Sequence, residues 1–332
     1  MSGTIEAQYY NVIDRSRVKC LLCPHNCVIQ NGKTGICGVR KNVDSRLITT
    51  IYGELTAQAI DPIEKKPLYH FYPGSDILSI GTKGCNFSCF FCQNWHISQN
   101  LNVNTYYSNP EDIVADAKNN NSLGIAYTYS EPFIWFEFVM DCMISANKNG
   151  IKNVFVTNGY INSEPLKEIL EYADAMNIDL KSFRESTYKK IMNGRLSSVL
   201  DTVQSVYKRS HLEITTLVVT GMNDDIEEMR EIVDWISSID RRIPWHISRY
   251  YPSYKYNAPS TDIDFMFRLY DEAVKKLDFV YCGNISPSHG RSDTICPSCR
   301  DIVISRSGYS VKVQGLEAGK CANCGYHLKI IH

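Results

Sequence analysis

"DILSIGTKGCNFSCFFCQN", residues 76–94, begins with a short apolar run typical of a buried β-strand and ends in three closely spaced cysteines. These cysteines, here called the triplet, follow the spacing Cys85-x3-Cys89-x2-Cys92. A tetrahedral metal ion or an iron–sulfur cube normally takes four protein ligands, and the triplet supplies three. An open coordination position is where a substrate or cofactor binds a metal centre. The stretch therefore predicts a catalytic metal centre in the loop that follows a strand.

Apolar or β-branched runs alternate with helical patterns from this strand to about residue 285. Such a series predicts parallel strands joined by right-handed crossovers. The runs that predict strands are 76–82, 124–130, 152–159, 176–181, 211–221, 243–250 and 279–284. The runs that predict helices are 108–122, 132–150, 163–173, 184–194, 198–209, 224–239 and 260–277. In the first of these helices, Asn109 and Pro110 are typical of a helix start.

About six or seven strands are too few to close an eight-stranded barrel. We therefore expect an α/β fold, an incomplete (β/α) barrel, with a doubly wound open sheet as the alternative. In either fold, functional groups gather at the carboxyl ends of the strands. The polar segments predicted to meet there are "TYSEP", "TNGY", "DLKS", "VTGMND", "SRYYP" and "GNIS".

Two further cysteine groups flank the predicted barrel, which spans residues 76–285. Residues 286–332 contain "CPSC" and "CANC", two Cys-x2-Cys pairs that predict a closed tetrahedral zinc ribbon. A tail this short needs a metal ion, because it cannot bury enough apolar surface to fold by itself. The ribbon cysteines are Cys296, Cys299, Cys321 and Cys324.

Residues 1–75 form a cysteine-rich metal-binding extension and a connector. The stretch "CLLCPHNCVIQNGKTGICGVR", residues 20–40, contains a quartet of cysteines, Cys20, Cys23, Cys27 and Cys37. Their spacing fits neither a zinc finger nor a standard ferredoxin run, so zinc and a second iron–sulfur cluster both remain candidates, zinc first. The connector "IEKKPLYHFYPG", residues 63–74, would either cover the barrel mouth or pack its aromatic side chains on the barrel side.

The composition of the 332 residues is that of an ordinary globular protein, with 44% hydrophobic and 21% charged residues. A net charge of −1 gives no overall attraction to nucleic acid or anionic lipid. The first residues lack the apolar core of a signal peptide, and no run approaches the length of a membrane span. We therefore expect a cytoplasmic protein with no membrane contact, whose 13 cysteines stay reduced and serve mainly as metal ligands.

The triplet, with an aromatic residue directly before its third cysteine and a βα series behind it, resembles the signature of the radical S-adenosylmethionine (SAM) superfamily. The resemblance implies a [4Fe–4S] cluster on Cys85, Cys89 and Cys92 whose fourth iron binds SAM. It also implies reductive cleavage of SAM to a 5′-deoxyadenosyl radical, with an electron from a reductant such as flavodoxin or ferredoxin. Such chemistry belongs to the cofactor, while the protein orients and shields it.

Several residues resemble the SAM contacts of pyruvate formate-lyase activating enzymes. Glu131 of "TYSEP" stands where the superfamily often has a Gly-Gly-Glu segment, although Tyr129 and Ser130 replace the glycines. By the same resemblance, further cofactor contacts are implied for Asp179 and Lys181 of "DLK", His246 of "WHISRYYP" and Asn158 of "VFVTNGY". In that last segment this chain departs from the activating enzymes, because it has Val156 where they carry an acidic residue.

Taken over nearly the whole chain, the motifs are most similar to the radical SAM member of the AmmeMemoRadiSam system. That similarity implies Memo-like or AMMECR-like partners and leaves the substrate open. The first functional hypothesis is hydrogen abstraction from a protein or another sizeable substrate. The alternative is an RNA-modifying or nucleic-acid-binding protein that reads its partner with the ribbon, whose segment from Cys296 onward is locally basic. No series of stacking aromatic and arginine residues supports this alternative.

Overall fold

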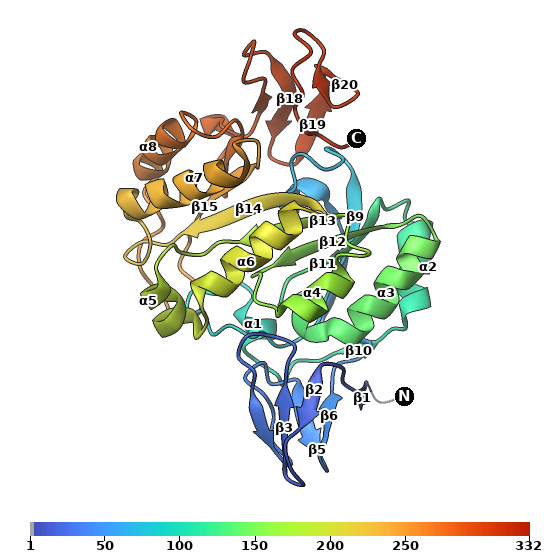
Figure 1. The fold of residues 1–332 in the computed structure, drawn as a ribbon. Helices are drawn as coiled ribbons and strands as arrows, with labels where there is room; N and C mark the ends of the chain where they lie inside the picture. The colour runs from blue at the N-terminus through green and yellow to red at the C-terminus, as the bar shows by residue number, and fades with distance from the viewer. Residues whose placement is uncertain (1–2) are drawn as a thin grey trace.

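The computed structural model describes residues 3–332. At its centre lies an eight-stranded sheet in the order β16-β15-β14-β13-β12-β11-β9-β8 (Figure 1). From β9 to β16 all its strands run parallel, and β8 pairs antiparallel with β9. β8 and β16 are its two edges, so the barrel is incomplete, as the sequence predicts. The strands are β8 (Ala57–Pro62), β9 (Asp76–Gly81), β11 (Gly124–Tyr127), β12 (Lys152–Thr157), β13 (Ala175–Asp179), β14 (His211–Val218), β15 (Trp245–Arg249) and β16 (Val280–Gly283).

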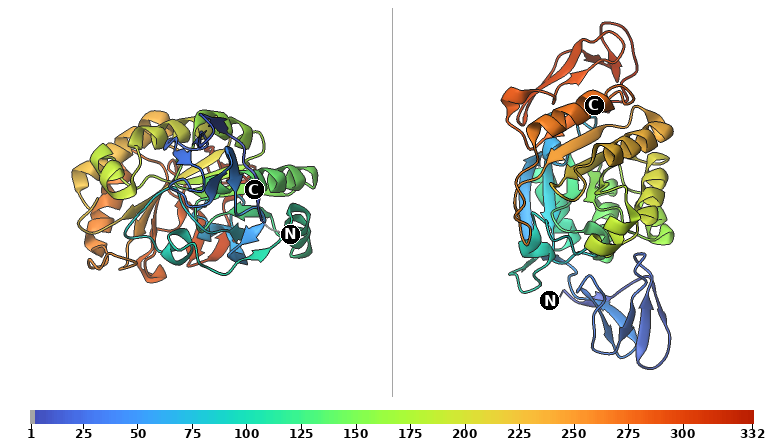
Figure 2. Two further views of the ribbon diagram at one scale, coloured as in Figure 1. Left: turned by 90° about the horizontal axis from the view of Figure 1, so that it is seen from below. Right: turned by 90° about the vertical axis from the view of Figure 1, so that its left-hand side faces the viewer.

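Helices cover the outside of this sheet (Figures 1 and 2). The prediction for the first of them is confirmed: Asn109 is the N-cap of α2 and accepts a hydrogen bond from the backbone N–H of Asp112 (2.8 Å), with Pro110 in the first turn. The helices are α2 (Pro110–Asn119), α3 (Phe136–Lys148), α4 (Ser163–Ile169), α6 (Leu196–Tyr207), α7 (Ile226–Asp240) and α8 (Ile263–Ala273).

The segment 184–194, predicted to be one helix, instead forms two short helical turns of different type. It consists of α5 (Glu185–Thr187) and a π-helical turn, η3 (Tyr188–Met192), which ends at Asn193 in the left-handed region (φ 56°). The chain around this turn contacts the triplet loop, because a Cβ on Gly194 would lie 2.6 Å from the ring of Phe87. The wider turn thus packs directly against the predicted metal-binding segment.

The strands of the barrel bury both faces, as expected of a parallel sheet covered by helices. Side chains alternate along each strand, so Ile125 and Tyr127 join the core beneath the helices, while Ala126 points to the opposite, inner face. Ala126 belongs to a separate apolar cluster with Val154 and Ala175. These inner side chains are small and leave room inside the barrel.

The connector 63–74, which we call the strap, fills that room. Its residues Ile63, Leu68 and Phe71 are buried in the inner apolar cluster, next to the 3₁₀ turn η1 (Ile63–Lys65). The Asn177 side chain donates a hydrogen bond to the carbonyl of Pro67 (2.8 Å) and fixes the middle of the strap. The strap therefore plugs the incomplete barrel, whereas the sequence suggested a cover over its mouth or packing on its side.

Strand β8 lies upstream of residue 76, where the sequence pattern places the start of the barrel. It pairs with β9 over its full length, from Ala57 opposite Gly81 to Pro62 opposite Asp76. The segment is partly exposed and ends in proline, and both properties are typical of an edge strand. Its polar, non-periodic sequence gives no strand signal, so pairing with β9 decides its conformation.

Small modules lie at opposite ends of the barrel (Figures 1 and 2). The N-terminal one has the sheets β1-β6-β5 and β2-β3-β4, and the ribbon has β17-β18-β19 and β20-β21. Near the N-terminal module, β7 (Glu54–Leu55) pairs with β10 (Tyr106–Tyr107), and the short helix α1 (Trp95–Ser98) follows the triplet. The N-terminal strands are β1 (Ile5–Glu6), β2 (Tyr10–Val12), β3 (Arg17–Cys20), β4 (Val28–Gln30), β5 (Arg40–Val43) and β6 (Arg46–Thr49). Those of the ribbon, which follows the turn η4 (Pro287–His289), are β17 (Thr294–Ile295), β18 (Ile302–Ser307), β19 (Ser310–Val313), β20 (Leu316–Glu317) and β21 (Lys320–Cys321). Across residues 3–332, no helix combines the length and apolar character needed to cross a membrane.

Candidate active site

A cavity of about 300 Å³ opens at the carboxyl ends of the parallel strands. The loops after β9, β11, β12 and β13 form most of its wall, and β14 and β15 complete it. The structure brings most of the predicted site residues together in this wall, since Cys85, Cys89, Cys92, Glu131, Asn158, Asp179 and Lys181 all line it.

The triplet loop is held by hydrogen bonds from neighbouring strand ends. Asn158 Nδ2 donates to Asn86 Oδ1 (2.8 Å) and lies 3.8 Å from Cys85 Sγ. The backbone N–H of Phe87 points at the same sulfur (3.4 Å). Burial raises the pKa of the Cys89 thiol to about 12, although the nearby Lys181 charge acts in the opposite direction. Metal binding would therefore have to displace thiol protons at neutral pH.

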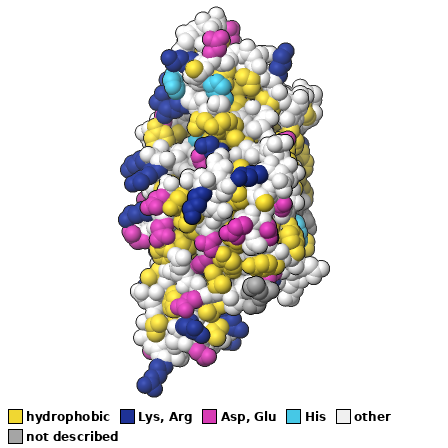
Figure 3. Space-filling model, turned by 90° about the vertical axis from the view of Figure 1, so that its right-hand side faces the viewer, with side chains coloured by type: hydrophobic (Ala, Val, Ile, Leu, Met, Phe, Trp, Pro, Cys, Tyr) yellow, Lys and Arg dark blue, Asp and Glu magenta, His cyan; other side chains and the backbone are white. Residues whose placement is uncertain are grey.

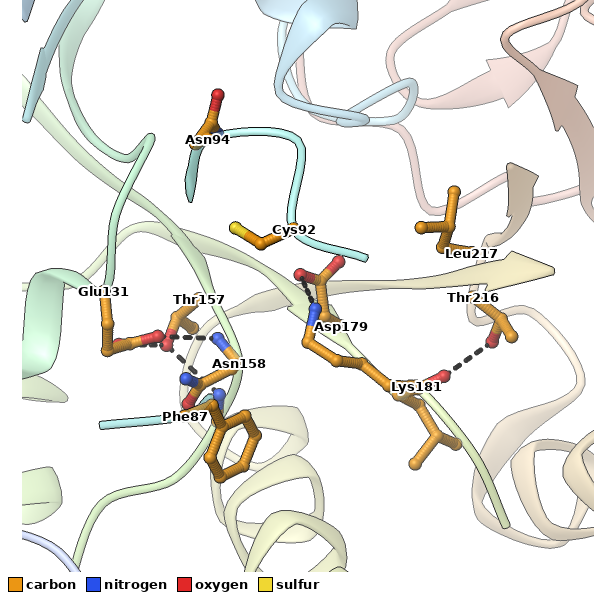
Figure 4. Close-up of polar contacts among 12 residues, drawn as sticks. Phe87, Cys92, Asn94, Glu131, Thr157, Asn158, Asp179, Lys181, Thr216 and Leu217 are labelled. Atoms are coloured by element: carbon orange, nitrogen blue, oxygen red, sulfur yellow. Dashed lines mark hydrogen bonds and ion pairs between the residues drawn. The ribbon is translucent and has the colours of Figure 1, made fainter. Parts of the chain in front are cut away.

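Glu131 is a buried carboxylate that accepts three hydrogen bonds, and those from Thr157 and Asn158 are drawn in Figure 4. It accepts bonds from the backbone N–H of Phe133 (3.1 Å), the Thr157 hydroxyl (2.7 Å) and the backbone N–H of Asn158 (2.9 Å). Burial raises its pKa to about 7 in spite of these bonds, and the Asp179 charge adds to the increase. A bound cation would favour the ionised form, so Glu131 is suited to meet a positive group in the cavity.

Asp179 and Lys181 form an ion pair on the opposite wall, with 2.7 Å between Lys181 Nζ and Asp179 Oδ2 (Figure 4). Burial acts to lower the pKa of Lys181, but the charges of Asp179 and Cys89 outweigh it, and the net shift is upward. Lys181 therefore carries a positive charge at every physiological pH. It is the group in this wall best suited to meet a carboxylate.

Tyr129 lies in a strained turn of the cavity wall. Its φ of 72° lies in the left-handed region that non-glycine residues rarely adopt. The Tyr129 hydroxyl donates to Asp61 (2.7 Å), which also accepts from Lys65 and Lys66 of the strap. Its carbonyl accepts a hydrogen bond from Asn94 Nδ2 (2.7 Å). Tyr129 thus joins the strap to the cavity wall, and these hydrogen bonds help to hold its backbone in the left-handed region.

His246 does not line the cavity, in contrast to the prediction from resemblance. It precedes Ser248 on the inner face of β15, and Ser248 is the residue that reaches the cavity. His246 Nε2 instead lies 2.6 Å from Glu213 Oε2, beneath the site, and its ring contacts that of Tyr69. His246 thus shares the inner face of β15 with Ser248 but lies one layer below the cavity.

Glu213 is the main buried residue near the site that the sequence did not predict. It lies on β14, fully buried, and accepts bonds from the backbone N–H groups of Tyr69 (3.0 Å) and His70 (2.7 Å) in the strap. His211 and His246 bond the same carboxylate. Although burial acts to raise its pKa, these hydrogen bonds hold the pKa of Glu213 well below its usual range. Strap residues Lys65 and Pro67 reach the cavity, so Glu213 supports its floor. An isolated glutamate in a strand was the only sequence signal.

Ser130 and Thr215 present unpaired hydroxyl groups at the cavity wall. Within residues 3–332, the Ser130 Oγ and Thr215 Oγ1 atoms are buried and have no hydrogen-bond partner. Buried polar atoms are normally paired, because leaving one unpaired costs about 1–3 kcal/mol. Their position favours a polar ligand in the cavity.

The ribbon cysteines form a compact group. Their sulfur atoms lie within 4.8 Å of one another, with 3.5 Å between Cys296 and Cys324 and 3.6 Å between Cys299 and Cys321. Four sulfurs around a zinc ion form a tetrahedron with edges of about 3.8 Å. The ribbon could therefore hold a single metal ion. The quartet, Cys20, Cys23, Cys27 and Cys37, lines a separate void in the N-terminal module.

Two basic residues of the ribbon contact the barrel or the strap. Arg306 is buried, donates to Thr294 Oγ1 (2.8 Å) and the Tyr69 carbonyl (2.8 Å), and stacks over the Tyr69 ring. Lys329 pairs with Asp240 of α7. On the face shown in Figure 3, basic side chains stand among acidic and apolar ones. The local positive balance of the ribbon thus partly serves to attach it to the barrel.

The comparisons with known proteins agree with this geometry. Residues 79–236 match the family model for the Radical SAM superfamily. The chain is 39% identical to the uncharacterized protein MJ0808 of Methanocaldococcus jannaschii, over 98% of this chain and 99% of that protein. It is 24% identical to the pyruvate formate-lyase 1-activating enzyme of Escherichia coli, over 43% of this chain and 61% of that protein. Streptococcus suis SuiB bound to S-adenosylmethionine superposes with a TM-score of 0.50 at 16% identity, over 64% of this chain and 50% of SuiB.

The likeness to SuiB supports the fold alone. The match to the family model supports a common family. The family model covers the strand before the triplet, the triplet itself and the strands that carry Glu131 and Lys181. Together with the three cysteines at the carboxyl edge of an incomplete parallel barrel, this match shows that the chain is an enzyme and belongs to the radical SAM superfamily.

Proposed function

We propose that this enzyme holds a [4Fe–4S] cluster on Cys85, Cys89 and Cys92 and cleaves SAM reductively. This proposal rests mainly on the triplet, which lines the cavity, while no fourth cysteine of residues 3–332 contributes to it. Three thiolates leave one iron of a cube open to a ligand. When bound, the cluster and SAM supply one-electron cleavage to methionine and a 5′-deoxyadenosyl radical, which abstracts a hydrogen atom.

The residues around the cavity fit these two groups. Cysteine sulfurs are the usual protein ligands of iron–sulfur clusters. The cavity volume of about 300 Å³ is typical of a site for a small ligand such as SAM. The unpaired hydroxyls of Ser130 and Thr215 would gain partners when a polar ligand enters. SuiB, a protein of similar fold, is known with S-adenosylmethionine bound. Its likeness supports the same class of cofactor here.

We propose that the charged residues on the two sides of the cavity bind the amino group and the carboxylate of the methionine part of SAM. Glu131 would accept a hydrogen bond from the SAM amino group, and Lys181 would neutralise the SAM carboxylate. Asp179 orients Lys181 and faces the cavity, where it can bond the ribose or stand near the sulfonium. Asn158 fixes the triplet loop beside Cys85. Val156 presents an apolar side chain to the cavity, so this position offers no charge to the ligand.

Replacement of Lys181 by alanine should weaken SAM binding about 10- to 100-fold, because a charged hydrogen bond contributes about 1.5–3 kcal/mol. The measurement is equilibrium binding of SAM to the reconstituted protein. Lys152→Ala is a matched control, since Lys152 also pairs with an aspartate (2.9 Å to Asp174) but lies outside the cavity. Equal affinities of wild type and Lys181→Ala, at equal iron content, would refute the assignment.

The substrate is proposed to be a protein or another sizeable molecule. A cavity of about 300 Å³ lies at the lower end of ligand-site volumes, so SAM would occupy most of it. The reacting group of the substrate would then have to enter from the mouth, while the rest stays outside. The Escherichia coli relative, named for activating pyruvate formate-lyase 1, acts on a protein, which supports this class of partner. We propose reduction by flavodoxin or ferredoxin; Memo-like or AMMECR-like proteins remain candidate partners.

We infer that the ribbon holds zinc. The sulfurs already lie near the spacing of a tetrahedral zinc site, and thiolate ligands are typical of structural zinc. The Cys299→Ser variant should lose about one zinc ion per chain, because closed structural sites use all four ligands. Metal analysis of the purified protein measures this change. Unchanged zinc content would contradict the assignment.

The decisive product assay follows from the proposed cleavage. Anaerobically reconstituted protein, reduced with dithionite and supplied with SAM, should release 5′-deoxyadenosine and methionine in equal amounts. Chromatography with mass detection quantifies both. A protein that has its full iron content but releases neither would show that the proposed function is wrong.

A further inference from the structure

The N-terminal quartet lies in an apolar void closed by the barrel. Cys20 ends β3 and the other three cysteines lie in the loops around β4, and all four line the same void. Leu22 and Ile29 line it from the N-terminal module, and Ile134 of the 3₁₀ turn η2 (Pro132–Trp135) lines it from the barrel. Apolar side chains around a metal site control its access to solvent and, with it, its redox potential.

The spacing of the sulfur atoms separates the quartet from the ribbon. The ribbon sulfurs lie within 4.8 Å of one another, as around one ion. Among residues 3–332, no three sulfurs of the quartet come that close together, although all four line one void. The same holds for the triplet, for which we propose a cluster. In a cube each sulfur binds a different iron atom, so its four cysteines are held further apart than around a single ion.

Arg40 has an unsatisfied hydrogen-bond donor and lines the same void as the quartet. Its side chain is 1% exposed, lines the void and pairs with Glu137 through Nη2 (3.0 Å) and Nη1 (3.2 Å). The remaining donor, Nε, is buried without a partner. Buried N–H groups are normally paired, and N–H groups commonly bond the sulfurs of iron–sulfur clusters. The orphan donor therefore indicates an acceptor that belongs in the void.

The quartet module also docks on the loop of the triplet. His25 Nε2 lies 2.7 Å from the carbonyl of Asn86, the residue after Cys85. On the other side, Gly84 packs so closely that a Cβ there would lie 2.8 Å from the carbonyl of Cys37. The segments that carry the two cysteine groups are thus in direct contact.

We propose that Cys20, Cys23, Cys27 and Cys37 hold a second [4Fe–4S] cluster, closed by four protein ligands and adjacent to the triplet loop. Its assembly takes up two ferrous ions, two ferric ions and four sulfides, and the four thiols release their four protons as they become ligands. Zinc, the first choice from the sequence alone, would require the sulfurs to move closer together. A closed second cluster has no open iron and so differs from the triplet in role.

The test uses a full-length variant in which alanine replaces the three triplet cysteines. Its outcome therefore does not depend on the proposed SAM chemistry. The variant Cys85→Ala/Cys89→Ala/Cys92→Ala, reconstituted anaerobically with iron and sulfide, should retain about four iron atoms per chain with the Mössbauer signature of a cube. Adding Cys23→Ser and Cys27→Ser to this variant should remove that iron. Bound ribbon zinc and an unchanged far-ultraviolet circular dichroism spectrum verify the fold of both proteins.

Two results would overturn the proposal. One is a folded triplet-free variant that contains a second equivalent of zinc and no iron. The other is a folded triplet-free variant that takes up no metal beyond the ribbon zinc. Retention of a cube that disappears with the quartet substitutions supports it.

Discussion

Replacement of Cys89 by alanine is expected to abolish the formation of 5′-deoxyadenosine. Cys89 is buried in the cavity wall between the other two cysteines of the triplet, and two thiolates cannot hold the proposed cube. Activity should fall at least about 10³-fold, to the background of the reagents, because the cofactor carries the chemistry. The loss should be accompanied by loss of the triplet iron, measured together with product in the same samples.

Cys142→Ala is the matched control for this variant. Cys142 is also fully buried, but it lies on α3 and does not line the cavity. Its replacement should leave iron content and product formation near wild type. If Cys89→Ala keeps its iron and forms product at the wild-type rate, the triplet is not the catalytic ligand set.

Replacement of Glu213 by alanine should lower the free energy of unfolding by about 3–5 kcal/mol. The substitution leaves two backbone N–H groups of the strap and two imidazoles without their acceptor inside the barrel. The strap would lose its attachment to β14, and the cavity floor would loosen with it. Urea unfolding followed by tryptophan fluorescence measures the change, with Trp245 on the neighbouring strand as a reporter.

Glu231→Ala provides the comparison for this prediction. Glu231 lies on α7, is about half exposed and pairs with Arg184 at the surface, so its loss should cost far less stability than the loss of Glu213. Because the native fold lowers the pKa of Glu213, its stabilising effect is present above the ordinary value of 4.5 and is lost as the pH falls below it. Wild type should therefore lose more stability than Glu213→Ala on acidification. Equal stability losses in the two alanine variants would contradict this role.

The order of strands and helices and the convergence of the site could be predicted from the sequence. Parallel strands end at a common edge, so residues after separate strands, such as Cys85, Glu131 and Lys181, must approach one another. Local signals, including the Asn109 cap and the triplet spacing, were sufficient for these predictions. The grouping of the four ribbon cysteines could also be predicted, because two Cys-x2-Cys pairs are the usual spacing of a tetrahedral metal site.

The inside of the barrel could not be predicted from the sequence. The strap enters it through contacts between residues far apart in the chain, such as Tyr69 with Glu213, and no local periodicity records such contacts. β8 forms a strand because it can pair with the backbone of β9 at the edge of the sheet. The amino-acid composition of β8 itself does not predict a strand. The position of His246 depends on its depth along β15, which a resemblance between motifs does not define. Likewise, the spacing of sulfurs in the quartet depends on the folded loops.

Binding of SAM to an open iron of the triplet cluster can be measured by electron–nuclear double resonance. The sample is the reduced enzyme with SAM that is isotopically labelled in its amino and carboxylate groups. We expect magnetic coupling of both labelled groups to the cluster in wild type and none in Cys89→Ala. A reduced wild-type cluster that shows no coupling to either label, at SAM concentrations that saturate binding, would contradict it.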